Sequence, residues 1–371
     1  MVSRRVFLAG VLGAGAAVAL ASLLMTRSES RRVASDYEVE VLAERLTVPW
    51  SITFLNQEEA VFTERSGALK LLTLSTGKVE TIATLEVAAV GEGGLLGVEH
   101  HKSGKNNNLF IYHTYRQKGA LYNKVVKANL SGGLDDVVEI IGQIPGGTIH
   151  NGGRLKIGPD KNLYITTGEA GEPSLSQKLD SLGGKILRLT LDGKIPADNP
   201  FNNPVYAYGL RNPQGLAWHP ETGLLYCTDH GPSGENFRRA HDEVNLIKPG
   251  QNYGWPSIIG DEQLPGMNKA VYHSGSETWA PSGCCFYSGT RNNNFKNSFF
   301  FACLRGAHLH RAVFSPDGEG VAYSEKLFVD RFGRLRDVVE GPDGHLYILT
   351  SNRDGRGTPA MNDDRIIRII L

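Results

Sequence analysis

The sequence predicts an all-β fold: a six-bladed β-propeller of four-stranded antiparallel blades, in which the N-terminal strand closes the ring. After residue 36, short β-branched and aromatic runs alternate with turns rich in Gly, Pro, Asn and Asp, and no long amphipathic helix stands out. One strand pattern recurs six times along the chain. With 371 residues, 40% of them hydrophobic, the chain can bury a large core as one unit.

The recurring unit is a turn followed by a short strand with an aromatic residue near its start. The six copies are residues 60–63, 109–112, 163–166, 225–228, 299–302 and 346–349. Their aromatic residues stand about 47 to 74 positions apart. Strand-rich repeats of this length are typical of propeller blades, so six copies predict six blades.

The last blade needs a strand from elsewhere in the chain. A further strand follows several copies of the unit, as at 68–74, 124–130, 185–191 and 365–370. After 365–370, the sixth blade still lacks one strand. The alternating segment 37–42 is expected to supply it, because an open edge would leave backbone groups unpaired.

The first 32 residues differ from the rest. Arg4 and Arg5 precede an apolar run at 9–25, and polar residues follow at 26–32. This pattern predicts a twin-arginine (Tat) export signal at 1–32, a propeller domain at 36–371, and a periplasmic or extracellular protein. The apolar run is long enough to serve as a membrane anchor if it is not cleaved.

Charge and cysteine content exclude several classes of protein. Thirty-nine basic residues balance thirty-nine acidic ones, so nothing in the charge indicates a nucleic-acid partner. No CxxC or CxxCH motif supports a zinc ribbon or a covalent haem. The four cysteines are Cys227, Cys284, Cys285 and Cys303. They allow three disulfide pairings, among which the sequence does not choose, and most of them are expected to fill core positions in strands.

Ionisable residues recur at one register of the repeat. His150 and Arg211 stand the same distance before a turn proline, and Glu92 holds that position in the second blade. Arg334 and Arg336 lie near it in the last blade. In a propeller this register lies where the innermost strand begins, at one mouth of the central channel. Packing between blades uses apolar side chains, so packing does not explain a ring of ionisable residues. The pattern therefore predicts a polar functional pocket.

These positions carry a recognisable set of motifs. The segments are 91–97, 150–155, 208–215, 229–232, 242–245, 252–256 and 334–337. In this order the chain resembles the soluble glucose and aldose sugar dehydrogenases that depend on pyrroloquinoline quinone (PQQ), over residues 45 to 371. The resemblance implies PQQ- and Ca²⁺-dependent oxidation of an aldose at its anomeric carbon to the lactone. Electrons would then pass to a quinone or another acceptor.

The resemblance assigns roles around the cofactor. His150 matches the general base, a task for which the near-neutral pKa of an imidazole is suited. Arg211 and Asn212 match residues beside the quinone oxygens, where a cation stabilises developing negative charge. Arg334 and Arg336 match the pair that binds the cofactor carboxylates. By residue type alone, these two arginines fit a solvated strand face equally well.

The resemblance also implies two calcium sites. Gly231 and Pro232 match residues whose backbone carbonyls bind the catalytic Ca²⁺. Glu243, together with the backbone of Tyr253, matches a second and structural Ca²⁺ site. Glu92 stands where some members have glutamine, in contact with cofactor or substrate.

Two positions depart from the glucose enzymes of this family. Ile149 stands where some members have aspartate before the base histidine, and Ser288 stands where some have lysine. These changes predict altered tuning of the base and altered anchoring of the cofactor. Both are closer to the aldose dehydrogenase branch.

Three other functions fit the sequence less well. A calcium-dependent sugar-lactone hydrolase could use the same propeller, since one fold hosts many activities. A non-enzymatic propeller that binds a protein or glycan would need neither base nor cofactor. A NAD enzyme is disfavoured, because no GxGxxG motif follows a strand into a helix.

Overall fold

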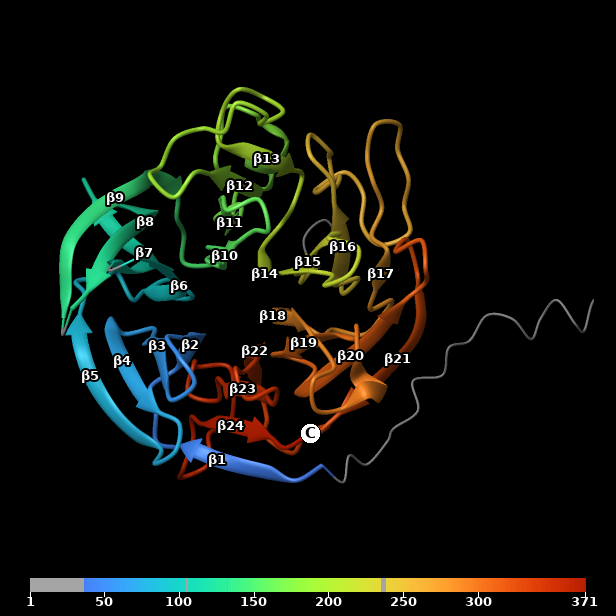
Figure 1. Cartoon of the computed structure of the whole chain (residues 1–371). Coiled ribbons are helices and arrows are strands. Elements are labelled where there is room, and N and C mark those ends of the chain that lie inside the picture. The colour runs from blue at the N-terminus through green and yellow to red at the C-terminus, as the bar shows by residue number, and fades with distance from the viewer. Residues whose placement is uncertain (1–36, 105, 132, 235–237) are drawn as a thin grey trace, which may run out of the picture. The chain divides into compact units, whose positions relative to one another are not determined.

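The protein forms a ring of small β-sheets around a central axis (Figure 1). A computed structural model describes residues 37–104, 106–131, 133–234 and 238–371. This part of the chain forms six four-stranded sheets, all with antiparallel pairing between neighbouring strands. The predicted six-bladed β-propeller is therefore confirmed.

Each blade runs from an inner strand at the axis to an outer strand at the rim (Figure 1). Blade one comprises β2 (Pro49–Phe54), β3 (Glu59–Glu64), β4 (Ala68–Thr73) and β5 (Lys78–Thr84); blade two comprises β6 (Leu95–Ser103), β7 (Asn106–Gln117), β8 (Ala120–Leu130) and β9 (Leu134–Pro145). Blade three comprises β10 (Leu155–Ile157), β11 (Leu163–Thr167), β12 (Lys185–Leu189) and β13 (Val205–Tyr208); blade four comprises β14 (Pro213–Trp218), β15 (Leu225–Asp229), β16 (Glu243–Ile247) and β17 (Tyr272–His273). Blade five comprises β18 (Pro281–Phe286), β19 (Phe299–Cys303), β20 (His308–Phe314) and β21 (Val321–Leu327); blade six comprises β22 (Leu335–Glu340), β23 (Leu346–Thr350), β24 (Ile366–Ile369) and β1 (Val39–Ala43). Two short 3-10 helices, η1 (Pro173–Gln177) and η3 (Asn293–Phe295), lie in connections.

The N-terminal strand closes the ring, as predicted. β1 pairs antiparallel with β24, which places Val39 opposite Ile369 and Val41 opposite Ile367. The Glu40 carboxylate also contacts the Arg368 guanidinium across this pair. The first and last strands of the propeller thus complete one blade, and the edge of β24 is covered.

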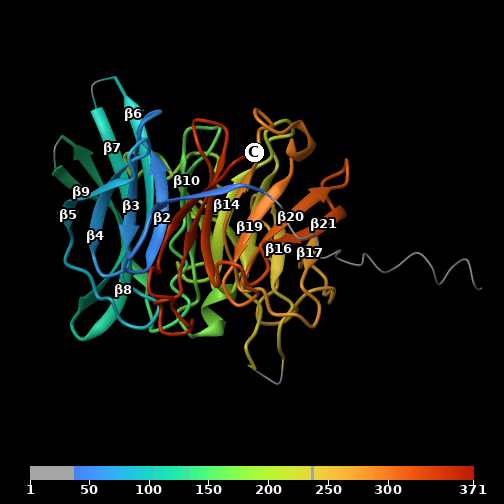
Figure 2. The same ribbon diagram turned by 90° about the horizontal axis from the view of Figure 1, so that it is seen from below.

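The recurring aromatic strand is the second strand of every blade. Its six copies lie in β3, β7, β11, β15, β19 and β23. The strands run between the two faces of the ring, as the side view shows (Figure 2). Residues just before an inner strand therefore gather at one face of the ring.

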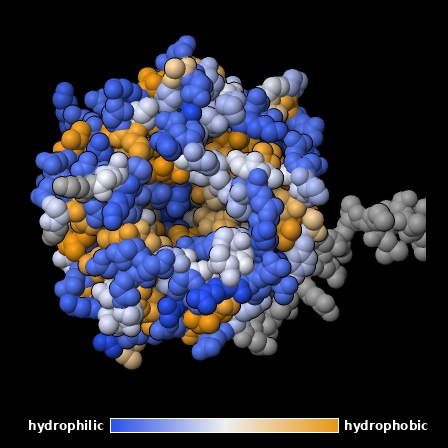
Figure 3. Space-filling view, in the orientation of Figure 1, coloured by the Kyte–Doolittle hydropathy of each residue, from blue (hydrophilic) through white to orange (hydrophobic). Residues whose placement is uncertain are grey.

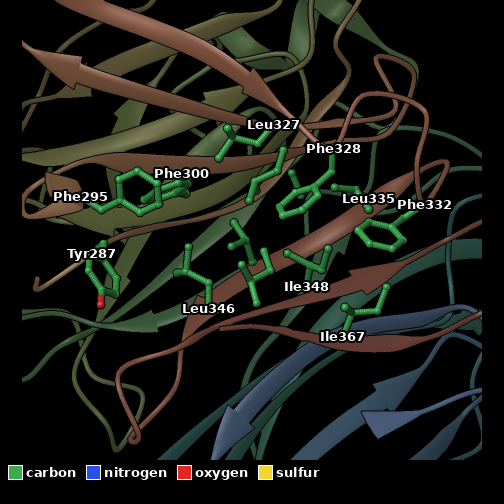
Figure 4. Close-up of a cluster of buried hydrophobic side chains, with 14 residues drawn as sticks. Tyr287, Phe295, Phe300, Leu327, Phe328, Phe332, Leu335, Leu346, Ile348 and Ile367 are labelled. Carbon is green, nitrogen blue, oxygen red and sulfur yellow. The ribbon is translucent and has the colours of Figure 1, made fainter. Parts of the chain in front are cut away.

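The hydrophobic core is divided among the blade interfaces. Six buried clusters each draw mainly on two neighbouring blades. The cluster between blades five and six contains Phe300 and Leu327 from one blade and Ile348 and Ile367 from the other (Figure 4). Because strand side chains alternate between faces, each blade is apolar on both sides.

A buried ion pair crosses the centre of the ring. Arg154, just before β10, donates to the Asp337 carboxylate in β22 at 2.8 Å, and both side chains are 2% exposed. Arg154 also donates to Ser51 Oγ at 3.0 Å and to the Gln214 carbonyl at 3.0 Å. Its guanidinium lies 4.6 Å from the Trp50 ring centre. One side chain thus connects blades one, three, four and six.

The cysteine prediction is also confirmed. All four cysteines are free, and Cys227, Cys284 and Cys303 are buried in strands. The predicted signal segment 1–32 lies outside the described residues. Within the described part of the chain, no helix has the length and apolar character needed to cross a bilayer.

The blade interfaces should dominate stability. Phe300 is fully buried in the cluster of Figure 4, so Phe300→Ala should lower the free energy of unfolding by about 3–5 kcal/mol. Met361, whose side chain is 87% exposed, provides the control, and Met361→Ala should change it by less than about 0.5 kcal/mol. Guanidinium denaturation measures both, and equal effects would contradict an interface-based core.

Candidate active site

A deep pocket lies where several inner strands begin. Seen along the axis from the other face, where the inner strands end, the molecule is also hollowed at its centre, and hydrophilic residues lie in that hollow (Figure 3). The pocket measures about 600 Å³ and includes residues from before β6, β10, β14 and β22. Its lining arginines are Arg65, Arg211, Arg239, Arg305, Arg334, Arg336 and Arg356. Three lining carboxylates, Glu92, Asp242 and Asp354, leave the wall with a cationic surplus.

The structure brings most of the predicted site residues together here. His150, Arg211, Glu92, Arg334 and Arg336 all line the pocket. The two predicted carbonyl donors for calcium do so as well. Their shared register in the repeat therefore corresponds to a shared place in space.

His150 is held by two carboxylates. Its Nδ1 contacts Glu169 Oε1, and its backbone N–H donates to Glu92 Oε2 at 2.9 Å. Because a carboxylate only accepts, Nδ1 carries the proton and Nε2 is the basic nitrogen of the neutral ring. The backbone of His150 has a φ of +55°, a left-handed conformation that is rare outside glycine and typical of functional sites.

The glycines after His150 permit this arrangement. Gly152 has a φ of +62°, and a Cβ there would lie 2.6 Å from the Thr166 carbonyl oxygen. Only a residue without a side chain lets the loop approach β11 so closely. Since β11 leads directly to Glu169, this contact sets the imidazole beside its carboxylate partner.

The Asp229 carboxylate holds the backbone of Arg211 in position. The Asp229 carboxylate accepts the backbone N–H of Arg211 at 2.9 Å and that of Asn212 at 2.6 Å. Burial raises the pKa of Asp229 to about 6, against the opposing effect of these two donors. The Arg211 guanidinium lies 5.4 Å from the Trp255 ring centre and donates to the His230 carbonyl at 3.4 Å. Its charge is therefore fixed at the pocket wall.

Arg334 is half-buried and Arg336 is buried, and both line the pocket, so they do not form a solvated face. Their side chains are 12% and 7% exposed. Arg334 donates to Asp354 Oδ2 from Nη2 at 2.8 Å, and Arg336 donates from Nη1 to Gln214 Oε1 at 2.8 Å. Burial lowers the pKa of Arg336 to about 10, so the group stays charged at neutral pH.

Three predicted residues do not line the pocket. Asn212 is fully buried and accepts the Gly152 N–H at 3.0 Å, so it supports the histidine loop. Glu243 and Tyr253 lie in and after β16, outside the cavity wall. The Tyr253 hydroxyl donates to the Leu246 carbonyl at 2.6 Å.

Glu243 is half-buried, and its carboxylate forms no ion pair with a basic side chain among the described residues. It accepts from the Gly260 N–H at 2.8 Å and from Asn245 Nδ2 at 3.1 Å. Burial, and secondarily the charge of Asp229, raise the pKa of Glu243 to about 8. Asn245 Oδ1, which is buried, has no hydrogen-bond partner within the described part of the chain. These oxygens form an electronegative group that suits a cation.

Gly231 and Pro232 form part of the pocket wall beside Asp242. The Gly231 N–H donates to Asp242 Oδ1 at 2.9 Å. A Cβ at Gly231 would lie 2.0 Å from the Ala240 carbonyl oxygen, so the turn requires glycine. Oxygen atoms and a carboxylate thus meet at this side of the pocket.

The two sequence departures have different outcomes. Glu169 supplies a carboxylate to His150, so the aspartate missing at Ile149 does not leave the imidazole without an acidic partner. Ser288 is exposed, lies after the far end of β18, and donates its N–H to Glu340 at 2.7 Å. It does not line the pocket, so the expectation that Ser288 removes a cofactor-anchoring cation is wrong.

The fold and pocket together define a class of protein: a propeller enzyme with a carboxylate-held histidine inside a cationic cavity. The profile of the glucose/sorbosone dehydrogenase family matches residues 46–367. The chain therefore belongs to the glucose/sorbosone dehydrogenase family.

Individual relatives agree with this family. The aldose sugar dehydrogenase YliI of Escherichia coli is 32% identical over 85% of this chain and 91% of its own length. Quinoprotein glucose dehydrogenase B of Acinetobacter calcoaceticus is 32% identical over 68% of this chain and 60% of its own. The PQQ-bound aldose sugar dehydrogenase of Streptomyces coelicolor is 34% identical, with a TM-score of 0.81 over 91% of this chain and 98% of that one. These matches confirm an oxidoreductase of the aldose sugar dehydrogenase type.

Proposed function

We propose that the chain oxidises aldose sugars at the anomeric carbon to the lactone, with PQQ and Ca²⁺ as cofactors. The observation that carries this proposal is the His150–Glu169 pair at the wall of a cavity lined by seven arginines. Family membership and the PQQ-bound relative from Streptomyces coelicolor support it. The base and the cations lie in one pocket, as oxidation with an anionic cofactor requires.

The pocket fits a flat tricarboxylate such as PQQ. Its volume of about 600 Å³ lies within the usual range for small-molecule sites. Buried donor atoms without a partner among the described residues include Arg336 Nε and His230 Nε2, and both residues line the cavity. Such donors carry a desolvation cost unless a ligand accepts from them. Arg334 and Arg336 would bind cofactor carboxylates, and Arg211 would lie near the redox-active oxygens.

Some pocket residues would transfer a proton, and others would stabilise the charge that develops during the reaction. When bound, PQQ supplies the acceptor for the hydride that leaves the anomeric carbon. His150 Nε2 accepts the proton of the anomeric hydroxyl, and Glu169 stabilises the resulting imidazolium through Nδ1. Glu92 holds the histidine backbone and pairs with Arg356 at 2.9 Å. Arg211 provides a fixed cation for negative charge that develops in the pocket.

Calcium would occupy two sites built of oxygen donors. The backbone carbonyls of Gly231 and Pro232 would bind the catalytic ion, whose role is to polarise the reacting carbonyl. Glu243 and Asn245 Oδ1, with the backbone of Tyr253, would bind the structural ion. The Glu243 carboxylate and the unpartnered Asn245 oxygen support this second site.

We also propose an electron acceptor and a cellular location for the protein. Electrons would pass to a quinone or another acceptor. The twin-arginine segment supports export to the periplasm or the medium, with a membrane tether if the segment is retained.

The lactone hydrolase is the weaker candidate. A single-metal hydrolase requires carboxylates and asparagine around its axial ion. This pocket instead has seven lining arginines against three carboxylates, which suits an anionic cofactor. Opening of sugar lactones without PQQ would favour the hydrolase.

Loss of one cofactor clamp should weaken PQQ binding. Arg336→Ala should raise the Kd for PQQ by about 10- to 150-fold, since a charged hydrogen bond contributes about 1.5–3 kcal/mol. Titration of the apoprotein, followed by PQQ absorbance in the presence of Ca²⁺, measures the Kd. Lys102→Ala, at an exposed lysine in the opposite half of β6, should leave it unchanged. Wild-type affinity in Arg336→Ala would remove this arginine from the site.

Glu169 should act through His150. Glu169→Gln should lower kcat for D-glucose or another aldose by about 10- to 1000-fold and leave the Kd for PQQ unchanged. Without the carboxylate the Nδ1 proton loses its acceptor and the imidazole is less well oriented, so kcat should fall while the KM for the sugar changes little. Glu172→Gln, on the exposed part of the same loop, is the control. A kcat equal to that of the wild type would contradict the pairing.

Calcium should counteract the charge of Glu243. The folded-state pKa of about 8 exceeds the ordinary value of 4.5, so the stabilising contribution is complete below about pH 4.5 and is lost as the pH rises to about 8. Removal of Ca²⁺ should therefore lower the Tm more at pH 8.5 than at pH 5.5. In chelator at pH 8.5, Glu243→Gln should melt above the wild type, and added Ca²⁺ should raise its Tm less. A Ca²⁺ response equal to that of the wild type would rule out a site at Glu243.

A further inference from the structure

A second group of potential ligands lies outside the pocket lining. Cys303 at the end of β19 pairs across the hairpin with His308 in β20, and His310 lies two residues further on the same strand face. One ligand atom from each side chain lies within 4.8 Å of the other two. The three residues are 0%, 2% and 0% exposed. They lie beside Tyr272 of β17, in the interface between blades four and five.

The hydrogen bonds orient the nitrogens of both rings. His308 Nδ1 lies 2.8 Å from the Gly306 carbonyl, which can only accept, so Nδ1 carries a proton and Nε2 presents a lone pair. That Nε2 lies 3.1 Å from His310 Nδ1. On its other side, His310 Nε2 lies 3.2 Å from the Tyr272 hydroxyl, which in turn contacts Ser324 Oγ at 3.0 Å. Outer partners of this kind, a carbonyl and a hydroxyl, are those that orient metal-binding histidines.

Two occupants can lie between the facing nitrogens. One is a proton shared in a relay from Gly306 to Ser324, and the other is a metal ion. The Cys303 sulfur distinguishes them, because it has no hydrogen-bond partner among the described residues and the relay does not use it. Nitrogens bound to a tetrahedral ion at about 2.0–2.1 Å lie about 3.3 Å apart, close to the spacing here.

We propose that Cys303, His308 and His310 bind a thiophilic d10 metal ion, Cu⁺ or Zn²⁺. One thiolate and two imidazoles are a donor set that such ions prefer to hard oxygen-binding cations. The Cys303 thiol releases its proton to the solvent as its sulfur bonds to the ion, and no electron is transferred. A fully buried site favours Cu⁺, because the thiolate and Cu⁺ have zero net charge and three donors suffice.

The ion would fix part of the pocket wall. The hairpin that connects Cys303 to His308 contains Leu304 and Arg305, both of which line the pocket. The Leu304 carbonyl accepts from Arg334 Nη1 at 3.3 Å. Metal binding would thus hold the turn that positions a cofactor arginine. The site itself does not depend on the proposed sugar oxidation.

The test uses the full chain, reduced and without PQQ. Because the site is buried, the metal is supplied during refolding as Co²⁺, Zn²⁺ or Cu⁺ without oxygen. After gel filtration, about one ion per chain should remain, and the Co²⁺ form should show a thiolate-to-metal charge-transfer band. The ion retained in equal competition identifies Cu⁺ or Zn²⁺ as the occupant.

Variants separate this site from other metal-binding groups. Cys303→Ala and His308→Gln should each weaken binding by at least about 100-fold and abolish the Co²⁺ band or reduce it strongly. Cys284→Ala removes a buried cysteine outside the cluster and should bind as the wild type does. If the cluster variants do not fold, a chain whose only cysteine is Cys303 should still show the band. The proton relay would be correct, and the proposal wrong, if no metal retention depended on Cys303.

Discussion

The rest of the structure depends on one buried interaction, the contact of Arg154 with Asp337 at the centre of the ring. These residues are far apart in the chain: Arg154 lies just before β10 and Asp337 lies in β22. Burial of a guanidinium is costly unless acceptors surround it, and here Asp337 and Ser51 accept from Nη1 while the Gln214 carbonyl accepts from Nε. Removal of either charge would leave the other buried and uncompensated. Arg154 also contacts Trp50 and Gln214, both of which line the pocket, so the ion pair that joins the blades supports the pocket wall as well.

Within the pocket, carboxylates hold several of the cations in position. Asp354 accepts from Arg334, Asp229 accepts the backbone N–H of Arg211, and Glu169 contacts His150. These two arginines and the base are therefore each held by an acidic residue of the protein. Groups held in this way need little reorganisation when charge develops in the cavity. Ordering these pocket side chains is entropically unfavourable. Burial of apolar side chains in the blade interfaces offsets this loss when the protein folds.

The sequence predicted the blades well and only half of the pocket. Its repeat located the start of each inner strand, where His150 and Arg211 lie, but missed Glu169, Asp229 and Asp354. In each blade the second strand runs antiparallel to the first, so its end meets the first strand's beginning, as Pro213 meets Asp229. An acid just after the recurring aromatic strand was thus a readable signal. Asn212 was predicted beside the cofactor but does not line the pocket. Neighbouring side chains in an extended chain point to opposite sides, and the repeat does not show whether Arg211 or Asn212 points toward the cavity.

The same geometry explains why the pocket can change while the fold persists. The residues that hold the ring together lie within strands and interface clusters, whereas the chemical groups lie at the strand ends and in turns. Ile149 illustrates this separation, since Glu169 from a neighbouring turn supplies the carboxylate that the sequence lacks beside the histidine. Cys303 illustrates a coupling between the two regions, because it is a core residue whose hairpin forms part of the pocket wall. An ion bound at that hairpin would fix the Leu304 carbonyl, which accepts from Arg334, and would thus influence a cofactor arginine without any contact with substrate.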